Sequence, residues 1–324
     1  MPGVRTSGSL TSLKLSLLKY RNIFVVYDSN VTEFAWKVAS GRPFMPITAT
    51  EESKTMDTVM SVCRWLMSEG AGRDALLLAI GGGVTTDIAG FAASIYKRGI
   101  RYANIPTTLL AMVDASIGGK TGVNLDSYKN MLGCFRQPEF TFIYPKVLQT
   151  LPEREFRSGA AEMLKTFLIK DGGNYEKALS VLSGKMDIEA LTPLIEAAAK
   201  VKSKIALSDE FDKGRRRVLN LGHTYGHAID WWQRTSGTAY PYTHGEAVAI
   251  GIIRAAVESE ARGIAKPGLA DKLKADFAYC GLPTDMPCRE EDLRPALLQD
   301  KKAGDGGVNF VYIKEPGKVI IKKK

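Results

Sequence analysis

The chain has few residues of the kinds that mark secreted or membrane proteins. It carries four cysteines in 324 residues, at positions Cys63, Cys134, Cys280 and Cys288, and none of them forms a C-x-x-C pair. A chain of this length needs no disulfides to hold its core, so we expect reduced thiols and a cytoplasmic location. No apolar run approaches the roughly 18 residues of a membrane span, and no apolar signal segment precedes a cleavage site. The sequence therefore predicts an ordinary globular protein.

Charge of one sign is in excess, because the formal net charge is +9. Part of the excess is a C-terminal run of lysines at 322–324, which we expect to be solvated. A basic protein that binds nucleic acid is one interpretation, but the sequence lacks a basic stripe with interleaved aromatic residues and any finger or helix-turn-helix signature. The remaining positive charge suits a smaller anionic ligand.

The first half of the chain alternates predicted strands with predicted helices. Strands are expected at 22–27, 75–80 and 101–105, and helices at 52–69 and 86–97. The apolar run at 75–80 is typical of a central strand buried on both faces. This alternation predicts a parallel sheet with helices on its faces.

The second half is predicted to be mostly helical. Helices are expected at 155–170, 188–208, 218–232, 246–262 and 269–279, followed by a hairpin of 308–313 with 319–321. We place a domain boundary near Thr150-Leu151-Pro152. The chain is thus expected to contain an α/β domain over 1–150 and a mostly helical domain over 151–324.

Two glycine-rich segments point to an anionic ligand. Gly81-Gly82-Gly83 follows a predicted strand and precedes a predicted helix, as in a phosphate cradle, although Thr86 stands where G-x-G-x-x-G requires glycine. A tight turn is the alternative. Further along, Asp114 and Lys120 flank a flexible Gly118-Gly119 pair, which suits a polyhydroxylated anion. A P-loop is excluded because its first glycine would fall at Asp114, and a surface ion pair is the alternative.

The chain has only three histidines, and all of them lie between His223 and His244. The spacing of four puts His223 and His227 on one face of a helix, which first suggests them as a ligand pair. Glu162 and Lys165 are three apart in an apolar helix, and a buried carboxylate needs a partner. Glu162, His223 and His244 would supply three ligands and leave one position open, the pattern of a catalytic zinc site. Satisfied core histidines are the alternative.

Taken together, these motifs resemble those of the 3-dehydroquinate synthase family, a branch of the sugar phosphate cyclases. The resemblance runs from about Asn22 to the end of the chain. It rests on G-G-G-V-T-T-D-I-A-G-F, I-P-T-T-L-L-A-M-V-D-A-S-I-G-G-K-T-G-V-N, K-N-M-L-G, L-P-E-R-E-F-R-S-G-A-A-E-M-L-K, L-N-L-G-H-T-Y-G-H-A and H-G-E-A-V-A-I-G, in that order.

The resemblance implies a fold, an activity and two cofactors. The fold is an NAD-binding α/β domain with a Rossmann-like parallel sheet, followed by a helical domain that binds metal and substrate. The activity is conversion of 3-deoxy-D-arabino-heptulosonate 7-phosphate (DAHP) to 3-dehydroquinate and phosphate in the shikimate pathway of aromatic amino acid biosynthesis. Family members use NAD, which is oxidised and regenerated in each turnover, and a divalent metal, zinc or alternatively cobalt. Between the two hydride transfers phosphate is eliminated, and an intramolecular aldol step closes the ring.

The resemblance also assigns residues by motif. The implied metal ligands are Glu162, His223 and His244. The implied NAD-binding residues are Asp28, Asn30, Glu51, Lys54, Gly82, Gly83, Asp87, Thr107, Thr108, Asp114, Lys120, Lys129 and Thr150. The implied substrate-binding and catalytic residues are Asp114, Lys120, Lys129, Asn130, Lys165, Lys202, Arg216, Asn220, His227, Lys301 and Lys302. Arg98 is implied to reach the active site of the partner subunit, so a homodimer is expected.

Two departures and three rival functions accompany the resemblance. The chain has about 20 residues before its first expected strand, so an edge strand or hairpin is expected to be absent or reduced. Extra residues at 231–242 are expected to reshape the edge of the site. The rivals are a valiolone-type or 2-deoxy-scyllo-inosose synthase, a metal-dependent polyol dehydrogenase with net redox turnover, and the nucleic-acid-binding protein. His227 argues against the valiolone type and less strongly against the inosose type. The K-T-G-V-N and K-N-M motifs argue against the dehydrogenase.

Overall fold

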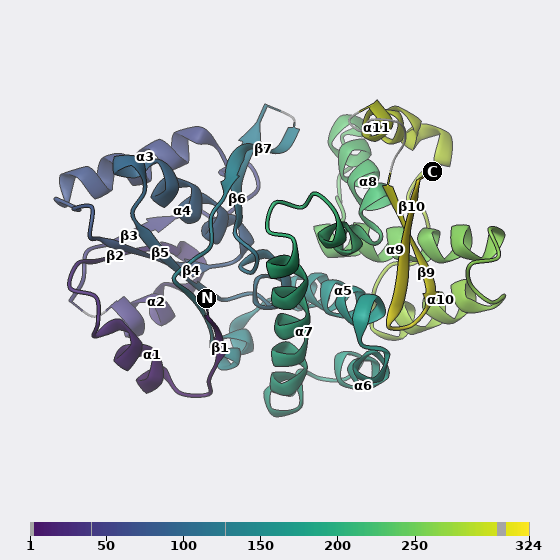
Figure 1. Cartoon of the computed structure of the whole chain (residues 1–324), viewed down its shortest axis with the longest axis horizontal. Coiled ribbons are helices and arrows are strands. Elements are labelled where there is room, and N and C mark those ends of the chain that lie inside the picture. The colour runs from purple at the N-terminus through teal and green to yellow at the C-terminus, as the bar shows by residue number, and fades with distance from the viewer. Residues whose placement is uncertain (1–2, 40, 127, 303–308, 324) are drawn as a thin grey trace. The chain divides into compact units, whose positions relative to one another are not determined.

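The computed structural model of the chain describes residues 3–39, 41–126, 128–302 and 309–323, without the side chains of 299–302. The chain divides into two compact units, Met1–Leu151 and Pro152–Lys324 (Figure 1). No described helix has the length and apolarity needed to cross a membrane. The four cysteines are free thiols.

The first unit is built on a six-stranded sheet in which every pairing is parallel. In spatial order its strands are β1 (Gly3–Thr6), β8 (Phe140–Ile143), β5 (Arg101–Pro106), β4 (Leu76–Gly81), β2 (Ile23–Asp28) and β3 (Phe44–Ile47). Every residue of β2 and β4 is buried, as an apolar run inside a parallel sheet requires. A four-residue N-terminal strand, β1, forms one edge, so an edge strand is present there, and the expectation of a reduced strand or hairpin stays a prediction.

Helices cover both faces of this sheet. Successive residues of β4 belong to opposite sides: Leu77 packs in one buried cluster and Leu78 in another. The cluster with Leu77 contains residues of α3 (Met56–Ser68) and α4 (Gly83–Ile95), whereas the cluster with Leu78 contains residues of α1 (Leu10–Leu17) and α2 (Thr32–Ala39). The unit is therefore the doubly wound α/β structure predicted from the sequence.

Shorter elements complete the first unit. They are η1 (Ser29–Val31), η2 (Tyr96–Arg98), η3 (Ala111–Ala115), η4 (Pro145–Thr150) and the antiparallel hairpin of β6 (Lys120–Leu125) with β7 (Tyr128–Phe135).

The second unit is mostly helical, as predicted. Its helices are α5 (Glu153–Lys170), α6 (Gly172–Leu182), α7 (Ile188–Ser208), η5 (Arg215–Asn220), α8 (His223–Ser236), α9 (His244–Ala261), α10 (Leu269–Tyr279) and α11 (Glu290–Lys302). The predicted hairpin is β9 (Asn309–Glu315) with β10 (Lys318–Lys323), although its expected first residue, Val308, lies outside the described residues. The prediction of one helix over 218–232 is wrong. Gly222 has a φ of 78°, which separates η5 from α8.

Glycines let the central helices of this unit approach one another closely. A Cβ built on Gly251 of α9 would lie 2.0 Å from the carbonyl oxygen of Gly222, just before α8. A Cβ on Gly245 would lie 2.0 Å from the carbonyl oxygen of Ser158 on α5. No side chain fits at either contact, so α9 packs against both neighbours backbone to backbone. Three helices that carry candidate ligands are thereby held close together.

Candidate active site

In the first unit, the candidate cofactor residues follow the carboxyl ends of neighbouring strands. Asp28 ends β2, Gly82 and Gly83 follow β4, and Thr107 and Thr108 follow β5. Because β2, β4 and β5 are parallel neighbours, these residues lie along one edge of the sheet. This edge is where open α/β sheets bind their ligands.

The three glycines serve both packing and helix initiation. A Cβ on Gly81 would lie 2.4 Å from Thr85 Oγ1, and one on Gly83 would lie 3.1 Å from the Ala115 side chain. Gly82 is the N-cap of α4 and provides no side-chain cap. The sequence left a tight turn and a phosphate cradle as alternatives for these glycines. In the structure they form a tight turn that leads directly into a helix N-terminus suited to phosphate.

Lys54 joins cofactor and substrate candidates of the first unit. Its buried ammonium donates hydrogen bonds to Asp87 Oδ2 and to Asn130 Oδ1, both at 2.6 Å. Asn124 extends this network, because its amide donates to Glu51 Oε1 at 2.8 Å and its oxygen accepts from the backbone N–H of Asn130 at 2.9 Å. Burial raises the pKa of Asp87, and Lys54 opposes that rise. The sequence analysis did not single out Asn124, although it lies in the K-T-G-V-N motif.

The remaining candidates of the first unit lie on several elements. The Asp28 carboxylate accepts the backbone N–H of Asn30 at 2.9 Å, and burial raises the pKa of Asp28. Asp114 lies in η3, and Lys120 and Lys129 lie on β6 and β7. Thr150 ends η4, where its hydroxyl donates to the carbonyl of Val147 at 3.2 Å.

Arg98 stands in strained backbone. Lys97 and Arg98 have φ values of 49° and 67°, and Gly99 follows with 115°. Left-handed conformations are unfavourable for residues with a side chain, so two in succession store strain that the surrounding structure must offset. A Cβ on Gly99 would meet the Arg136 guanidinium at 2.8 Å, which makes glycine the fitting residue after Arg98.

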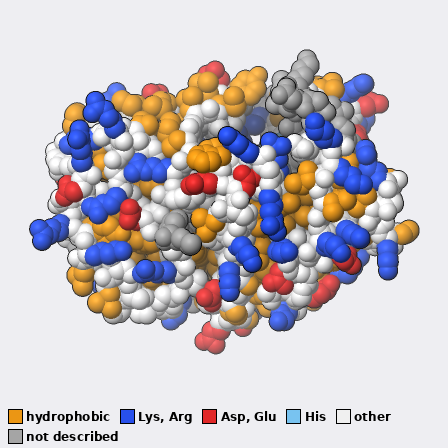
Figure 2. Space-filling model, viewed as in Figure 1, with side chains coloured by type: hydrophobic (Ala, Val, Ile, Leu, Met, Phe, Trp, Pro, Cys, Tyr) orange, Lys and Arg blue, Asp and Glu red, His pale blue; other side chains and the backbone are white. Residues whose placement is uncertain are grey.

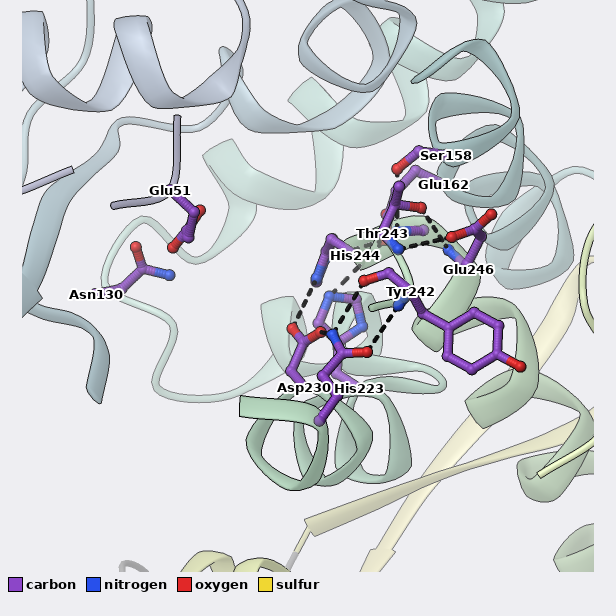
Figure 3. Close-up of polar contacts among 12 residues, drawn as sticks. Glu51, Asn130, Ser158, Glu162, His223, Asp230, Tyr242, Thr243, His244 and Glu246 are labelled. Atoms are coloured by element: carbon purple, nitrogen blue, oxygen red, sulfur yellow. Dashed lines mark hydrogen bonds and ion pairs between the residues drawn. The ribbon is translucent and has the colours of Figure 1, made fainter. Parts of the chain in front are cut away.

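The second unit brings Glu162, His223 and His244 together (Figure 3). One ligand atom from each lies within 4.8 Å of the others. Both oxygens of the Glu162 carboxylate are buried, and neither accepts a hydrogen bond of normal geometry within the described part of the chain. Two imidazoles and a buried carboxylate are a fitting donor set for a zinc-type metal ion.

The imidazoles of this group are oriented alike. The Nε2 atoms of His223 and His244 lie 3.9 and 3.6 Å from Glu162 Oε1. On the opposite side of each ring, His223 Nδ1 lies 3.2 Å from the carbonyl oxygen of Leu221, and His244 Nδ1 lies 3.6 Å from Asp230 Oδ2. Both rings therefore turn Nε2 toward Glu162 and Nδ1 toward an acceptor, the usual arrangement of metal-binding histidines.

The surroundings of His223 favour its neutral imidazole. The Lys165 ammonium lies 2.5 Å from Glu162 Oε2, and both side chains are 1% exposed. Burial, followed by the positive charge of Lys165, holds the pKa of His223 well below its usual range. A neutral imidazole is the form that binds a metal ion.

Local contacts fix His244 at the first turn of α9. Thr243 and Glu246 form a capping box, with the Thr243 N–H donating to Glu246 Oε2 at 2.6 Å. Arg154 donates to the same oxygen at 2.8 Å. The N–H of Gly245 donates to Ser158 Oγ at 3.1 Å, so α5 binds the end of α9 directly beside His244.

His227 shares a helix face with His223, as its spacing predicted. Their ring centroids are 5.2 Å apart, whereas those of His227 and His244 are 6.3 Å apart. His227 is exposed and is not a member of the three-residue group. The helical spacing first suggested His223 and His227 as a ligand pair. Of these two, His223 belongs to the candidate ligand group and His227 lies beside it.

Cationic candidates lie on the same unit. Lys202 of α7 and Arg216 of η5 are buried, and Asn220 ends η5. Arg216 donates to the Glu210 carbonyl at 2.8 Å, and its own N–H donates to Asp209 Oδ2 at 3.1 Å. Three backbone N–H donors lower the pKa of Asp209, which the sequence analysis had not singled out. The side chains of Lys301 and Lys302 lie outside the described residues.

The sequence analysis also missed two buried residues on α8, Asp230 and Gln233. Asp230 faces His244, and Gln233 donates to Asp230 Oδ1 at 3.2 Å. One signal could have found the first of them. Asp230 follows His223 by seven residues, and that spacing returns to the same helix face.

Comparison with known proteins places this chain in a family. Residues 44–158 match the family model described as 3-dehydroquinate synthase N-terminal, and residues 159–303 match 3-dehydroquinate synthase C-terminal. A curated 3-dehydroquinate synthase of Acidithiobacillus ferrooxidans (strain ATCC 53993 / BNL-5-31) is 42% identical over 92% of this chain and 84% of that protein.

Solved structures give the same picture of the fold. A 2-epi-5-epi-valiolone synthase from Streptomyces hygroscopicus subsp. jinggangensis 5008, with NAD+ and Zn2+ bound, matches with a TM-score of 0.90 at 29% identity and covers 100% of this chain and 93% of its own. A 2-deoxy-scyllo-inosose synthase complexed with carbaglucose-6-phosphate, NAD+ and Co2+ matches with a TM-score of 0.86 at 25% identity, covering 98% and 91%. With both family models matched in order along its length, the chain belongs to the 3-dehydroquinate synthase family.

Proposed function

We propose that this chain is an enzyme that converts DAHP to 3-dehydroquinate with release of phosphate, as a carbon–oxygen lyase of the shikimate pathway. The observation that carries the proposal is the group of Glu162, His223 and His244, oriented for a metal ion in a chain of this family. The atoms of DAHP equal those of 3-dehydroquinate plus phosphoric acid, so the reaction consumes no net oxidant.

In this proposal the two units bind different ligands. Residues 1–150 bind NAD through the strand-end residues and the Lys54 network, and residues 151–324 bind the metal and the substrate. Glu162, His223 and His244 hold a divalent metal, zinc or cobalt. When bound, the metal acidifies substrate hydroxyls and NAD accepts and returns a hydride. The NAD+ and metal in the two related cyclase structures support both assignments.

The chain's own side chains supply charge and position. Lys165, Lys202 and Arg216 are buried cations, and a phosphate or carboxylate desolvated among them is held by charge-assisted hydrogen bonds. Arg216 can bind a carboxylate with two parallel N–H donors, and its backbone is already fixed by Asp209. His227, exposed beside His223, is suited to exchange a proton or hydrogen bond with a substrate hydroxyl.

Other residues complete the proposed substrate and cofactor sites. Asp114, Lys120, Lys129, Asn130 and Asn220 are assigned to the substrate, with the two lysines also near the cofactor. Lys301 and Lys302 are assigned to the phosphate. Asn130 is additionally assigned to positioning Lys54, because the two side chains are hydrogen-bonded at 2.6 Å.

A homodimer in the cytoplasm is part of the proposal. The dimer rests on the role that the family resemblance implies for Arg98, which lies in a strained segment of the kind that clusters at functional sites. Arg98 would contribute to the active site of the partner subunit. A gel-filtration mass measurement tests the dimer, and mixing Arg98→Ala protein with a variant inactive at another site tests the shared site, since mixed dimers would regain activity.

Another sugar phosphate cyclase is the second candidate, because the two solved relatives make a valiolone and an inosose. The discriminating experiment measures phosphate release from DAHP, sedoheptulose 7-phosphate and glucose 6-phosphate with catalytic NAD. We expect release from DAHP alone, abolished by chelation and restored by zinc. Release from another sugar phosphate would assign a different substrate, and stoichiometric NADH would assign a dehydrogenase.

The basic surface gives the nucleic-acid alternative little support. Figure 2 shows Lys and Arg side chains interspersed with acidic and apolar ones on the visible face. A gel-shift measurement at physiological salt tests this alternative directly. Binding without DAHP activity would favour it.

The role of His227 is tested separately from that of the ligands. His227→Ala is expected to retain one metal per chain, measured by elemental analysis, while DAHP turnover falls at least tenfold. His223→Ala is the matched comparison on the same helix and is expected to lose the metal. Metal loss in His227→Ala would contradict the proposed ligand set.

A further inference from the structure

The two candidate ligand histidines are supported in different ways. The Nδ1 atom of His223 faces a backbone carbonyl, that of Leu221, whereas the Nδ1 atom of His244 faces the Asp230 carboxylate at 3.6 Å. Asp230 is 2% exposed, so its charge is largely removed from water. A buried carboxylate is unfavourable without polar partners. Asp230 is thus a buried carboxylate beside a candidate ligand, and the proposed ligand set assigns it no role.

Asp230 is itself held in place by Gln233. The Gln233 amide nitrogen donates to Asp230 Oδ1 at 3.2 Å and to the Tyr242 carbonyl at 3.0 Å. The Gln233 amide oxygen accepts the Tyr242 N–H at 2.8 Å. One side chain thus fixes both the carboxylate and the chain segment two residues before His244. These contacts span the end of α8 and the start of α9 (Figure 3).

We infer that Asp230 is a positioning residue of the metal site, acting through His244 and supported by Gln233. The carboxylate oxygen lies 3.6 Å from His244 Nδ1 and, by its negative charge, favours the tautomer that carries the proton on Nδ1, which leaves the Nε2 lone pair directed toward Glu162. A carboxylate behind a ligand imidazole orients the ring, fixes its tautomer and increases its basicity. The inference rests on the proposed function in one respect, the metal bound by Glu162, His223 and His244.

The position of His244 makes this support necessary. The His244 side chain is 34% exposed, compared with 14% for His223 and 1% for Glu162. It is also the first residue of α9, after a segment rich in exposed residues. A ring less confined by packing depends more on a polar partner to hold one orientation. Asp230 provides that partner to the least buried ligand.

The isosteric change Asp230→Asn gives the sharpest test. If the oxygen of the introduced amide still accepts from Gln233, the NH2 group of that amide faces His244 Nδ1 in place of an acceptor. The imidazole proton must then move to Nε2, where it blocks the metal. We expect zinc affinity, measured by competition with a chromophoric chelator, to fall about 10–100-fold. The visible spectrum of the Co2+-loaded protein should change with it.

Two further variants separate this role from general packing. Glu258→Gln removes a carboxylate on α9 that contacts Tyr225 instead of a histidine, and it should bind zinc as the wild type does. Asp230→Glu restores a carboxylate and should bind zinc more tightly than Asp230→Asn. Equal zinc affinity and unchanged cobalt spectra in Asp230→Asn and the wild type would overturn the inference while leaving the metal site intact. A wild-type protein that binds no zinc would instead overturn the proposed metal site.

A measurement on the wild type keeps the test independent of folding in the variants. The chain has only three histidines, so nitrogen-15 histidine labelling gives three ring systems to assign by NMR. In the zinc-loaded protein we expect His244 to carry its proton on Nδ1. A proton on Nε2 with zinc bound at Nδ1 would contradict the role of Asp230. The same spectrum reports His227 as an internal reference.

Discussion

Gly251 controls how closely α8 and α9 can pack, and the change Gly251→Ala tests the importance of that contact. The added Cβ would lie 2.0 Å from the Gly222 carbonyl oxygen, 2.9 Å from its carbon and 3.1 Å from the Gly226 nitrogen. All three atoms belong to backbone, so no side-chain rotation can relieve the overlap. The helices must separate by about 1 Å before the closest pair reaches 3.0 Å.

This separation acts on stability and on the metal site. Overpacking of this kind destabilises by about 1–3 kcal/mol, and the better helix propensity of alanine offsets up to about 1 kcal/mol. With the full offset, a net loss of up to about 2 kcal/mol remains, which corresponds to a fall in Tm of up to roughly 8 °C for a unit of this size. Because Gly222 immediately precedes His223, the displacement also moves one ligand relative to His244. Misplacement by 1 Å is enough to reduce activity about 100-fold.

The assay is thermal unfolding of the metal-free protein, followed by zinc affinity in a chelator competition. Gly173→Ala is the matched control, since Gly173 also lies in a helix, and its built Cβ has no neighbour closer than Asp171 Oδ1 at 3.9 Å. We expect the control to keep its Tm and its zinc. The reasoning is refuted if Gly251→Ala matches the control in both measurements.

Three further predictions concern Glu162, Lys54 and Glu246. Glu162→Gln leaves the buried Lys165 ammonium without its counter-charge, so the metal-free protein should lose about 3–5 kcal/mol of stability in chemical denaturation. The variant should also bind no zinc, measured by elemental analysis. Stability equal to that of the wild type would contradict the ion pair. Lys54→Met leaves Asp87 without its cation and should weaken NAD binding about tenfold by calorimetry, with zinc affinity unchanged as the control. Burial would raise the pKa of Glu246, but hydrogen bonds from Arg154 and Thr243 lower it overall. The contribution of ionised Glu246 to folding stability is therefore present at neutral pH and is lost as pH falls through about 4.5 and below. The protection factors for amide exchange at the start of α9, which compare each rate with its intrinsic rate at the same pH, should fall over that range in the wild type and should not in Glu246→Gln.

The sequence predicted elements whose pattern is local. The run at 75–80 and the helix at 188–208 correspond to β4 (Leu76–Gly81) and α7 (Ile188–Ser208), because an apolar run or a long apolar stripe defines each by itself. The break at Gly222 was missed, since the residues on both sides continue a helical pattern. Only the close approach of α9 to this point requires the left-handed glycine.

Elements without such a pattern were also missed. α6 begins with Gly172-Gly173, which indicates a loop, and yet the Asp171 side chain caps it by accepting the Asn174 N–H. β7 exposes most of its residues, so it lacks the buried run that marks a strand in a parallel sheet. β7 pairs with the neighbouring β6 in a hairpin and not with the parallel sheet, so it does not need a buried apolar run.

The site shows the same division between local and tertiary information. The motifs directed attention to Glu162, His223 and His244, which the structure brings together. The spacing of seven from His223 places Asp230 on the same helix face, but it does not show that Asp230 faces His244, because that contact depends on the start of α9 lying beside α8. Asn124 was missed for a related reason, since it acts by joining the hairpin to Glu51.

The hydrogen bonds of Gln233 to Tyr242 have a consequence for how this region can vary. They join Gln233 to Tyr242 and so tie together the two ends of the segment between α8 and α9. The residues between these two positions that follow Gly237, including Tyr240 at 87% exposed, form a surface loop. Length and composition can change within such a loop while the ligand after it stays in place. This loop is therefore a position where relatives can diverge in sequence, and where a reporter group can be attached, without disturbing His244.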